Sequence, residues 1–308
     1  MLFAVRRRTA VTCSVLWLVA GIAAQGSAEP AAADGAARRT RVVAILGASA
    51  SAGFSDQLIT PKTADDREHN ATLKLRDALA PLFAEDSLQF RDFSSMLMFT
   101  EPERIGGKQV DRALAAKPDA VLAIDFLFWF GYSTRGGDRA ARMKLQDEGL
   151  AALARIDRPM LVGDYPEMRD IDPRMLAPHA IPDAETLAEL NARLRAWAAT
   201  RPNVRLFSLG ERLRDLRERK REIALGRDRL VLEPAHLLQT DRLHVTRLGM
   251  AVLASEVVAA LADALPDEPL LHAEVRDLHA VLERLDLVDL ARSKAAEAIP
   301  AGAAGGGR

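Results

Sequence analysis

The most constraining feature of the sequence is an alternation, between residues 41 and 264, of short apolar runs with longer amphipathic segments. Several runs are apolar throughout, which is typical of strands buried on both faces of a parallel sheet. The strands are expected at 41–47, 88–93, 120–128, 159–165 and 204–209. The helices are expected near 66–82, 107–116, 138–156, 184–199, 210–223 and 246–264. We therefore expect an α/β fold, with a flavodoxin-like five-stranded parallel sheet in a three-layer α/β/α domain.

The N-terminus has the layout of a secretory signal peptide. Three arginines precede an apolar run of 16 residues, Thr9–Ala24, and small residues follow at Gly26 and Ala28. The alternative is a membrane anchor, but a transmembrane helix needs about 20 apolar residues. We expect cleavage after Ala28, a periplasmic or secreted protein, and no stable membrane insertion afterwards.

Charge and cysteine content exclude several classes of function. The formal net charge of the 308 residues is −1, and loss of the three leader arginines takes it to −4. Such a surface lacks the basic footprint of a nucleic-acid binder and disfavours anionic lipid. The single cysteine, Cys13, lies inside the leader. The mature chain therefore has no disulfide, no thiolate nucleophile and no cysteine metal ligand.

Composition divides the remaining chain into four parts. Residues 29–40 are Ala-rich without an apolar period and are expected to be a disordered spacer, followed by the predicted α/β domain at 41–266. Residues 267–292 read as one amphipathic helix, which either packs on the domain or binds a partner. The low-complexity end, 293–308, is expected to be a disordered tail.

The loop after the first predicted strand, Gly47–Gly53, is the first candidate for chemistry. Ligands of doubly wound sheets gather at the carboxyl ends of strands, and the sequence here is GASASAG. The loop could hold a phosphate, present Ser49 as a nucleophile beside N–H donors, or simply form a tight turn. Phosphate binding has the weakest support, because neither common phosphate-loop motif occurs in the chain.

A second candidate segment, DRLHVTRLG, lies just before the last predicted helix of the domain. Asp241 and His244 are three residues apart, so the carboxylate can orient the imidazole and leave its other nitrogen free. A serine nucleophile needs such a base. His236 could join these two residues in a metal site, but no metal-ligand spacing supports that alternative.

Together, these two segments resemble the SGNH/GDSL hydrolases, a family of esterases, lipases and thioesterases. GASASAG is similar to the first block of the family, with Ser49 in the nucleophile position, and DRLHVTRLG is similar to the closing Asp-x-x-His block. The resemblance covers residues 41–264. It implies a flavodoxin-like three-layer fold, Ser49, His244 and Asp241 as catalytic residues, and no cofactor or metal.

The chain departs from the family's pattern at three places. Ala48 replaces the usual aspartate after the first glycine, and the second strand ends in DFSSMLMF without the glycine that supplies an oxyanion donor. A backbone N–H of Ser94 or Ser95 is expected to take that place. The family's oxyanion asparagine is expected near Leu127 but is absent. A missing donor costs a hydrolase of this kind roughly 100- to 1000-fold in rate.

The aromatic segment IDFLFWFGY supplies further candidates. Alternation sends Phe126 and Phe128 into the core, whereas Trp129 follows the strand and could wall an acyl or sugar pocket. Asp125 is an acid in an apolar run, so it either satisfies a neighbouring helix end or belongs to the substrate site, and Asp164 has the same alternatives. We include Asp125, Trp129 and Ser95 among the substrate-binding candidates.

The leading hypothesis is an exported serine hydrolase that cleaves a carboxylic ester, either an acyl ester or an acetylated carbohydrate. The expected partners are a small-molecule or carbohydrate ester and no nucleic acid. The second hypothesis is a weakly active or inactive binding or scaffolding protein of the cell envelope on the same fold, which the absent asparagine favours.

Overall fold

The computed structural model of the protein describes residues 40–55, 69–84, 88–135, 137–225, 228–264 and 273–297. The expected leader, the expected spacer apart from Thr40, and the last eleven residues of the expected tail lie outside the described residues. Predictions about those segments therefore stay predictions.

Five parallel strands form the central sheet in the order β2-β1-β3-β4-β5. Strands β3 and β4 lie inside the sheet, and every residue of both is buried, as expected of strands covered on both faces. The predicted α/β fold class with a five-stranded parallel sheet is confirmed. The strands are β1 Arg41–Ile45, β2 Leu88–Asp92, β3 Ala120–Ala123, β4 Met160–Gly163 and β5 Val204–Phe207.

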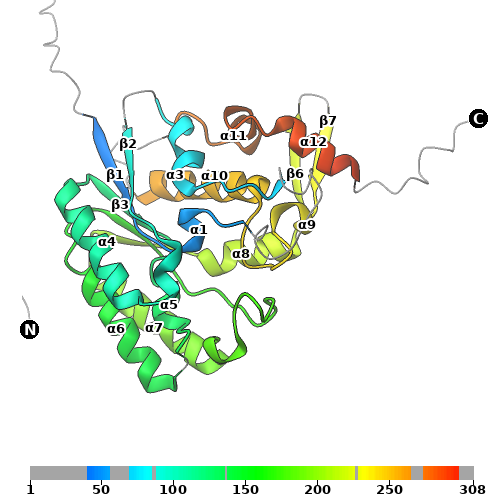
Figure 1. Cartoon of the computed structure of the whole chain (residues 1–308). Coiled ribbons are helices and arrows are strands. Elements are labelled where there is room, and N and C mark those ends of the chain that lie inside the picture. Colours follow the sequence, from blue (N-terminus) through cyan, green and yellow to red (C-terminus); the bar gives the residue numbers. More distant parts are fainter. Residues whose placement is uncertain are drawn as a thin grey trace, which may run out of the picture. The chain divides into compact units, whose positions relative to one another are not determined.

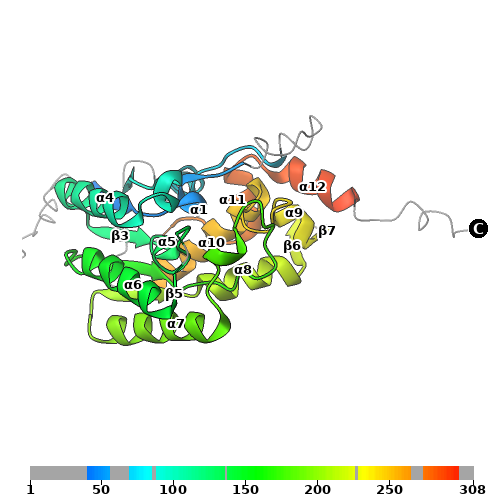
Figure 2. The same cartoon turned by 60° about the horizontal axis from the view of Figure 1, so that its bottom comes forward.

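Helices cover both faces of this sheet, and the two views show them as separate layers (Figures 1 and 2). One layer consists of α4 Pro102–Ala116, α6 Arg139–Leu153 and α7 Ala184–Ala199. The other contains α3 Leu75–Leu79 and α10 Arg247–Ala264. Asp138 and Asp183 start α6 and α7 by accepting backbone N–H groups of the first helical turn. Helix α10 is apolar on nearly all sides, because it packs against the sheet and against other helices at once.

Short elements connect these layers, mostly at the carboxyl edge of the sheet. They are α1 Ser49–Ala52, η2 Ala80–Leu82, η3 Met96–Phe99, α5 Phe128–Gly131, η4 Pro178–Ala180, α8 Leu209–Glu218 and α9 Pro234–Leu237. Among the described residues, no helix combines the length and the apolar composition needed to cross a membrane.

Two predicted boundaries are wrong near the carboxyl edge. The strand expected at 120–128 ends at Ala123, and a turn at 124–127 leads into α5. Every residue of α5 is buried, so its sequence lacks the polar face that distinguishes a helix from a strand. The helix expected at 66–82 is interrupted within the described part: His69 is helical, residues 71–74 are not, and α3 begins at Leu75 after the extended backbone of Lys74.

A β-hairpin was not predicted. Strands β6 Arg221–Leu225 and β7 Asp228–Leu232 pair antiparallel in a sheet of their own. The helix expected at 210–223 therefore ends at Glu218, as α8. Ile223 is buried while its neighbours Glu222 and Ala224 are exposed, which is the alternation of a half-buried strand.

The C-terminal segment forms two helices where one was expected. α11 Leu278–Arg284 and α12 Val288–Glu297 are separated by a turn in which Asp286 adopts a left-handed conformation with φ 54°. Helix α12 also extends five residues into the expected tail. The buried side chains of the segment include Ala273, Val281, Leu282, Leu287, Ala291, Lys294 and Ala295. α11 packs against α10, and α12 against β7, so this segment packs on the domain.

Candidate functional site

The chain leaves β1 at the carboxyl edge of the sheet and turns at once into α1. Gly47 is required at this turn by close packing, because a Cβ there would lie 2.0 Å from Oδ1 of Asp125. Gly53 ends α1 with φ 73°, a conformation that other residues rarely adopt. Ser49 is the first residue of α1 and is half-buried, so its hydroxyl lies at the edge where ligands of such sheets bind.

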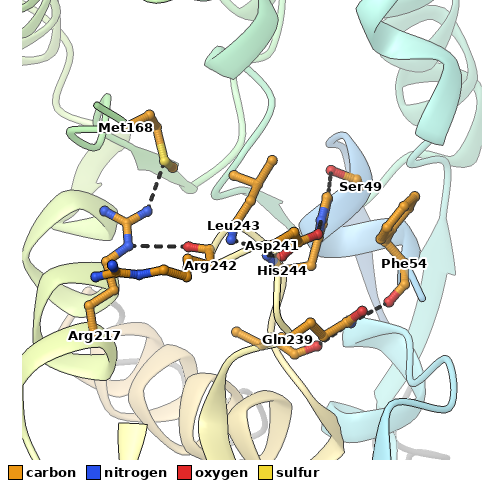
Figure 3. A network of polar contacts seen from close by, with 10 residues as sticks. Ser49, Phe54, Met168, Arg217, Gln239, Asp241, Arg242, Leu243 and His244 are labelled. Carbon is orange, nitrogen blue, oxygen red and sulfur yellow. Dashed lines mark hydrogen bonds and ion pairs between the residues drawn. The ribbon is translucent and has the colours of Figure 1, made fainter. Parts of the chain in front are cut away.

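A loop before α10 brings His244 to this serine. The Nε2 atom of His244 lies 2.9 Å from the Oγ of Ser49, and its Nδ1 lies 2.7 Å from Oδ2 of Asp241. Figure 3 shows the imidazole between the hydroxyl and the carboxylate. The structure thus brings together the three residues that the sequence analysis selected as catalytic.

The hydrogen bonds define the tautomer of His244. An ionised carboxylate can only accept, so Nδ1–H donates to Asp241 and Nε2 accepts from the hydroxyl of Ser49. His244 and Asp241 are 6% and 3% exposed, so water screens this pair weakly. Burial on its own raises the pKa of Asp241, but the hydrogen bonds from the His244 side chain and from the backbone N–H groups of His244 and Leu243 outweigh it and hold that pKa below its usual range.

The loop itself is built around the other oxygen of Asp241. Its Oδ1 accepts the backbone N–H groups of Leu243 and His244 at 2.9 and 3.0 Å. Arg242, between Asp241 and Leu243, adopts a left-handed conformation with φ 58°. A backbone hydrogen bond from Gln239 N–H to the carbonyl of His244 closes the loop at 2.8 Å. These bonds fix the position of the imidazole.

Phe54 was not selected from the sequence, yet it covers one face of the histidine. Its ring stacks on the imidazole of His244, with centroids 4.0 Å apart. The Gln239 side chain donates to the Phe54 carbonyl at 2.7 Å, which ties the segment after α1 to the histidine loop (Figure 3). The only available signal in the sequence is its place directly after Gly53, at the end of the family-like block.

Asp125, predicted as a helix-end partner or a substrate ligand, lies beneath the serine turn. Its Oδ1 accepts the hydroxyl of Ser51 at 2.6 Å, and its Oδ2 accepts the Ser51 N–H at 3.1 Å. Burial raises the pKa of Asp125, and these hydrogen bonds partly offset the effect. The carboxylate therefore stabilises the start of α1 from the turn after β3, the strand next to β1. The apolar side chain of Ala48 cannot take this role.

The predicted oxyanion role of Ser94 or Ser95 is wrong. The Ser95 N–H donates to the carbonyl of Gly47 at 3.0 Å, and the Ser94 N–H donates to Oδ1 of Asp92 at 2.9 Å. Both donors are therefore occupied within the fold. The Ser95 bond instead attaches the segment after β2 to the serine turn, whereas the Ser94 bond is local to that segment.

Trp129 does not wall the space beside Ser49. It is 7% exposed and packs between Phe99 and Phe128, with ring centroids 5.9 and 5.0 Å away. The aromatic residue that reaches the cavity at Ser49 from this segment is Phe128. The difference follows from the early end of β3, because α5 rotates the aromatic side chains by helical rather than strand geometry.

Two other candidates have structural roles. Oδ1 of Asp164 accepts the N–H of Gly210 at 2.7 Å and so caps the start of α8. His236 accepts the Glu233 N–H at 3.1 Å in the first turn of α9. In the part of the chain that the structure describes, no group of three His, Cys, Asp or Glu side chains is placed to hold a metal.

Arg217 is a further residue that the sequence did not single out. Its guanidinium donates to the carbonyl of Glu167 at 2.6 Å, to Sδ of Met168 at 2.9 Å and to the carbonyl of Arg242 at 3.2 Å. Figure 3 shows it between Met168 and Arg242. It joins the loop after β4 to the histidine loop.

Comparisons with known proteins give distant structural similarity only. No family model matches the chain, and no curated protein sequence shows significant similarity. Similar solved structures include LAE5, an α/β hydrolase enzyme from the metagenome of Lake Arreo, Spain, at 17% identity and a TM-score of 0.43, over 71% of this chain and 94% of that one. The psychrotrophic esterase EstA from Pseudoalteromonas sp. has 14% identity and a TM-score of 0.43, over 74% of this chain and 100% of the EstA chain. TesA has 14% identity and a TM-score of 0.41, over 73% of this chain and 100% of the TesA chain. Similarity this distant carries no functional conclusion.

Proposed function

We propose that the protein is a serine hydrolase that cleaves a carboxylic ester, of the SGNH/GDSL type. The observation that carries the proposal is the unbroken hydrogen-bonded series from Ser49 through His244 to Asp241, with distances of 2.9 and 2.7 Å. A hydroxyl, a base and a buried orienting carboxylate in this order are the requirements of nucleophilic acyl transfer.

The proposed reaction has two halves. The Ser49 Oγ attacks the acyl carbonyl carbon while its proton passes to Nε2 of His244, and Asp241 stabilises the imidazolium. Nε2–H then protonates the leaving alkoxide, the ester C–O bond breaks, and an acyl-serine remains. Water attacks this acyl-serine with His244 again as base, which releases the carboxylic acid and restores the hydroxyl.

One oxyanion donor is available at the nucleophile itself. The Ser49 N–H belongs to the first turn of α1, and N–H groups in a first turn have no acceptor within their helix. We propose that it stabilises the negative oxygen of the tetrahedral intermediate. Because the N–H groups of Ser94 and Ser95 are occupied, we expect a slow enzyme.

The decisive experiment combines a covalent probe with one substitution. A fluorophosphonate probe should label the purified mature protein at Ser49, and Ser49→Ala should lower the turnover of p-nitrophenyl acetate to the uncatalysed rate. Thermal stability should change little, because a half-buried turn serine fills no core cavity. Ser208→Ala, an exposed serine at the end of β5, is the matched control and should keep both labelling and activity.

A second function is favoured by one specific observation, the occupied N–H groups of Ser94 and Ser95. On that alternative, the protein is a weakly active or inactive binding or scaffolding protein of the cell envelope. Wild type and Ser49→Ala would then be equally inert on acetate, octanoate and acetylated-sugar esters, and no probe would label Ser49.

We also propose that the protein is exported and works in the periplasm or outside the cell. The basis is the order of arginines, apolar run and small residues in the first 28 positions. N-terminal sequencing of the mature protein should begin at Glu29, whereas an intact Met1 in the cytoplasmic fraction would contradict export.

A further inference from the structure

We infer that the acyl group of the substrate is short, with two or three carbons, and that it enters an apolar cavity between Ser49 and Met168. This inference rests on the proposed function and names the substrate class of the same site. The cavity touches both Ser49 and His244, so an acyl group held on Ser49 has direct access to it. Its remaining polar lining residue is Asp125, whose carboxylate oxygens are both bonded to Ser51.

The lining of the cavity selects an apolar group. Apart from Ser49, His244 and Asp125, every lining residue is apolar. The apolar lining residues are Ala48, Ala50, Phe128, Pro166, Met168, Leu209, Leu213, Leu243, Val245 and Leu253. Such a surface favours the alkyl part of an acyl group over a sugar or a charged group, which would lose hydrogen bonds to water without replacement.

The size of the cavity sets the length of that alkyl part. Its volume is about 30 Å³, and a cavity needs roughly 10–15 Å³ on this measure to hold one water molecule. The cavity therefore has room for about two non-hydrogen atoms beyond the carbonyl carbon. A methyl or an ethyl group fits, whereas a butyryl or longer chain requires the walls to move.

The walls are held in place. Met168 and Leu253 are each 1% exposed, and Leu209 is 2% exposed, so they are packed from behind by the core. Arg217 fixes Met168 further, through its hydrogen bonds to the Met168 sulfur and to the preceding carbonyl (Figure 3). Interiors packed in this way do not open for an extra methylene without cost.

Two other apolar features do not compete for this role at the serine. A larger hollow of about 70 Å³, lined by Met160 and Pro202, lies at the amino ends of the strands, opposite Ser49. Exposed side chains of η3, namely Met96, Leu97 and Phe99, lie near α1 but do not line the cavity. A long acyl chain would have to lie on that outer surface.

The test varies the acyl group alone, with p-nitrophenyl acetate, butyrate and octanoate. For wild type, kcat/KM on acetate should exceed that on butyrate by at least about tenfold, since one misfitting methylene is worth roughly 10- to 200-fold. Octanoate should be slower still. Met168→Ala removes one wall, and the butyrate-to-acetate ratio should rise about tenfold.

The matched control is Met143→Ala, which truncates a buried methionine on α6 that does not line the cavity and should leave the ratio unchanged. If Met168→Ala does not fold, Leu213→Val shortens another wall and should change the ratio in the same direction. Equal or faster turnover of octanoate by wild type would overturn the inference and leave the proposed function intact. Inactivity on all three esters, without labelling of Ser49, would overturn the proposed function and this inference with it.

Discussion

Asp241 has two separate tasks, and its two carboxylate oxygens divide them. Oδ2 accepts from the imidazole of His244, while Oδ1 accepts the N–H groups of Leu243 and His244 and so shapes the loop. The residue that orients the base is therefore also the residue that folds the segment carrying the base.

Asp241→Asn should separate these tasks. An asparagine can keep its oxygen on the two N–H groups, but its NH₂ group then faces Nδ1 of His244. The imidazole must accept there and carry its proton on Nε2, where it can no longer take the proton of Ser49. We expect kcat to fall on the order of 10⁴-fold with a small change in stability. Esterase kinetics measure this loss, and Asp263→Asn, an exposed carboxylate on α10, should keep full activity.

The same carboxylate makes stability depend on pH in a defined direction. Because the folded-state pKa of Asp241 is lowered, its ionised form stabilises the fold above the unfolded-state pKa of about 3.9. That contribution is lost as the pH falls through the folded-state value. Urea unfolding at steps between about pH 6 and pH 3 should show a steeper loss of stability in wild type than in Asp241→Asn. Equal slopes would mean that Asp241 is not preferentially ionised in the folded protein.

Between elements, the main connection at the site runs from the turn after β3 to α1. Asp125 supports the first turn of α1 through Ser51, two residues beyond the nucleophile. Proteins of the resembled family have an aspartate directly after the first glycine, where this chain has Ala48. The carboxylate that supports the serine turn here comes from a different strand.

Asp125→Asn should therefore affect both stability and rate. Either its amide NH₂ faces the donor groups of Ser51 or one of these donors loses its acceptor, which should cost about 1–3 kcal/mol in the free energy of unfolding. The serine turn then shifts, so kcat should fall more than KM rises. Asp164→Asn is the matched control, because Asp164 caps α8 and not α1. It should lose stability while kcat stays the same, and the same pattern in Asp125→Asn would contradict a positioning role.

The elements that could be predicted from the sequence are those whose pattern of apolar and polar residues indicates which of their faces are buried. The parallel strands could be recognised because burial on both faces demands continuous apolar runs, and α7 because its exposed face is polar. Helix α5 could not be recognised, since a fully buried helix has no period to read. The hairpin β6–β7 is short, and the first residues of β6 fall within the helix expected at 210–223.

At the site, the contact within one loop could be predicted from the spacing of its residues, whereas the contacts between distant segments could not. Asp241 and His244 are three residues apart, so their bond could be expected from the loop alone. The occupation of the Ser95 N–H by Gly47, and the attachment of Met168 to Arg217, join segments about 50 residues apart. Nothing in the pattern of either segment indicates its partner.

Across the whole described domain, the C-terminal segment is part of the folded unit. The N–H groups of Glu274 and Val275 donate to the carbonyl of Leu82, and α11 packs on α10. Leu282 is fully buried, whereas the adjacent Glu283 is exposed. Helix α11 thus covers the layer that carries α3 and α10, while α12 packs against β7.

Leu282→Ala should therefore destabilise the entire domain by about 2–5 kcal/mol, as truncations of buried leucines do. Glu283→Ala, its exposed neighbour, should change the free energy of unfolding by no more than about 0.5 kcal/mol. Urea unfolding of the two variants measures the difference. Similar small effects would show that this helix is docked too weakly to support the core.

The stacking of Phe54 on His244 restricts how the imidazole can rotate. Half a turn of that ring about its Cβ–Cγ bond would put Cε1 in the place of Nε2 and Cδ2 in the place of Nδ1, and would so carry a proton on Nε2 away from Ser49. With one face of the ring under Phe54 and Nδ1 held by Asp241, this rotation is blocked. In the proposed mechanism, a proton that enters at Nε2 must therefore also leave from Nε2, on the side of the ring that faces Ser49.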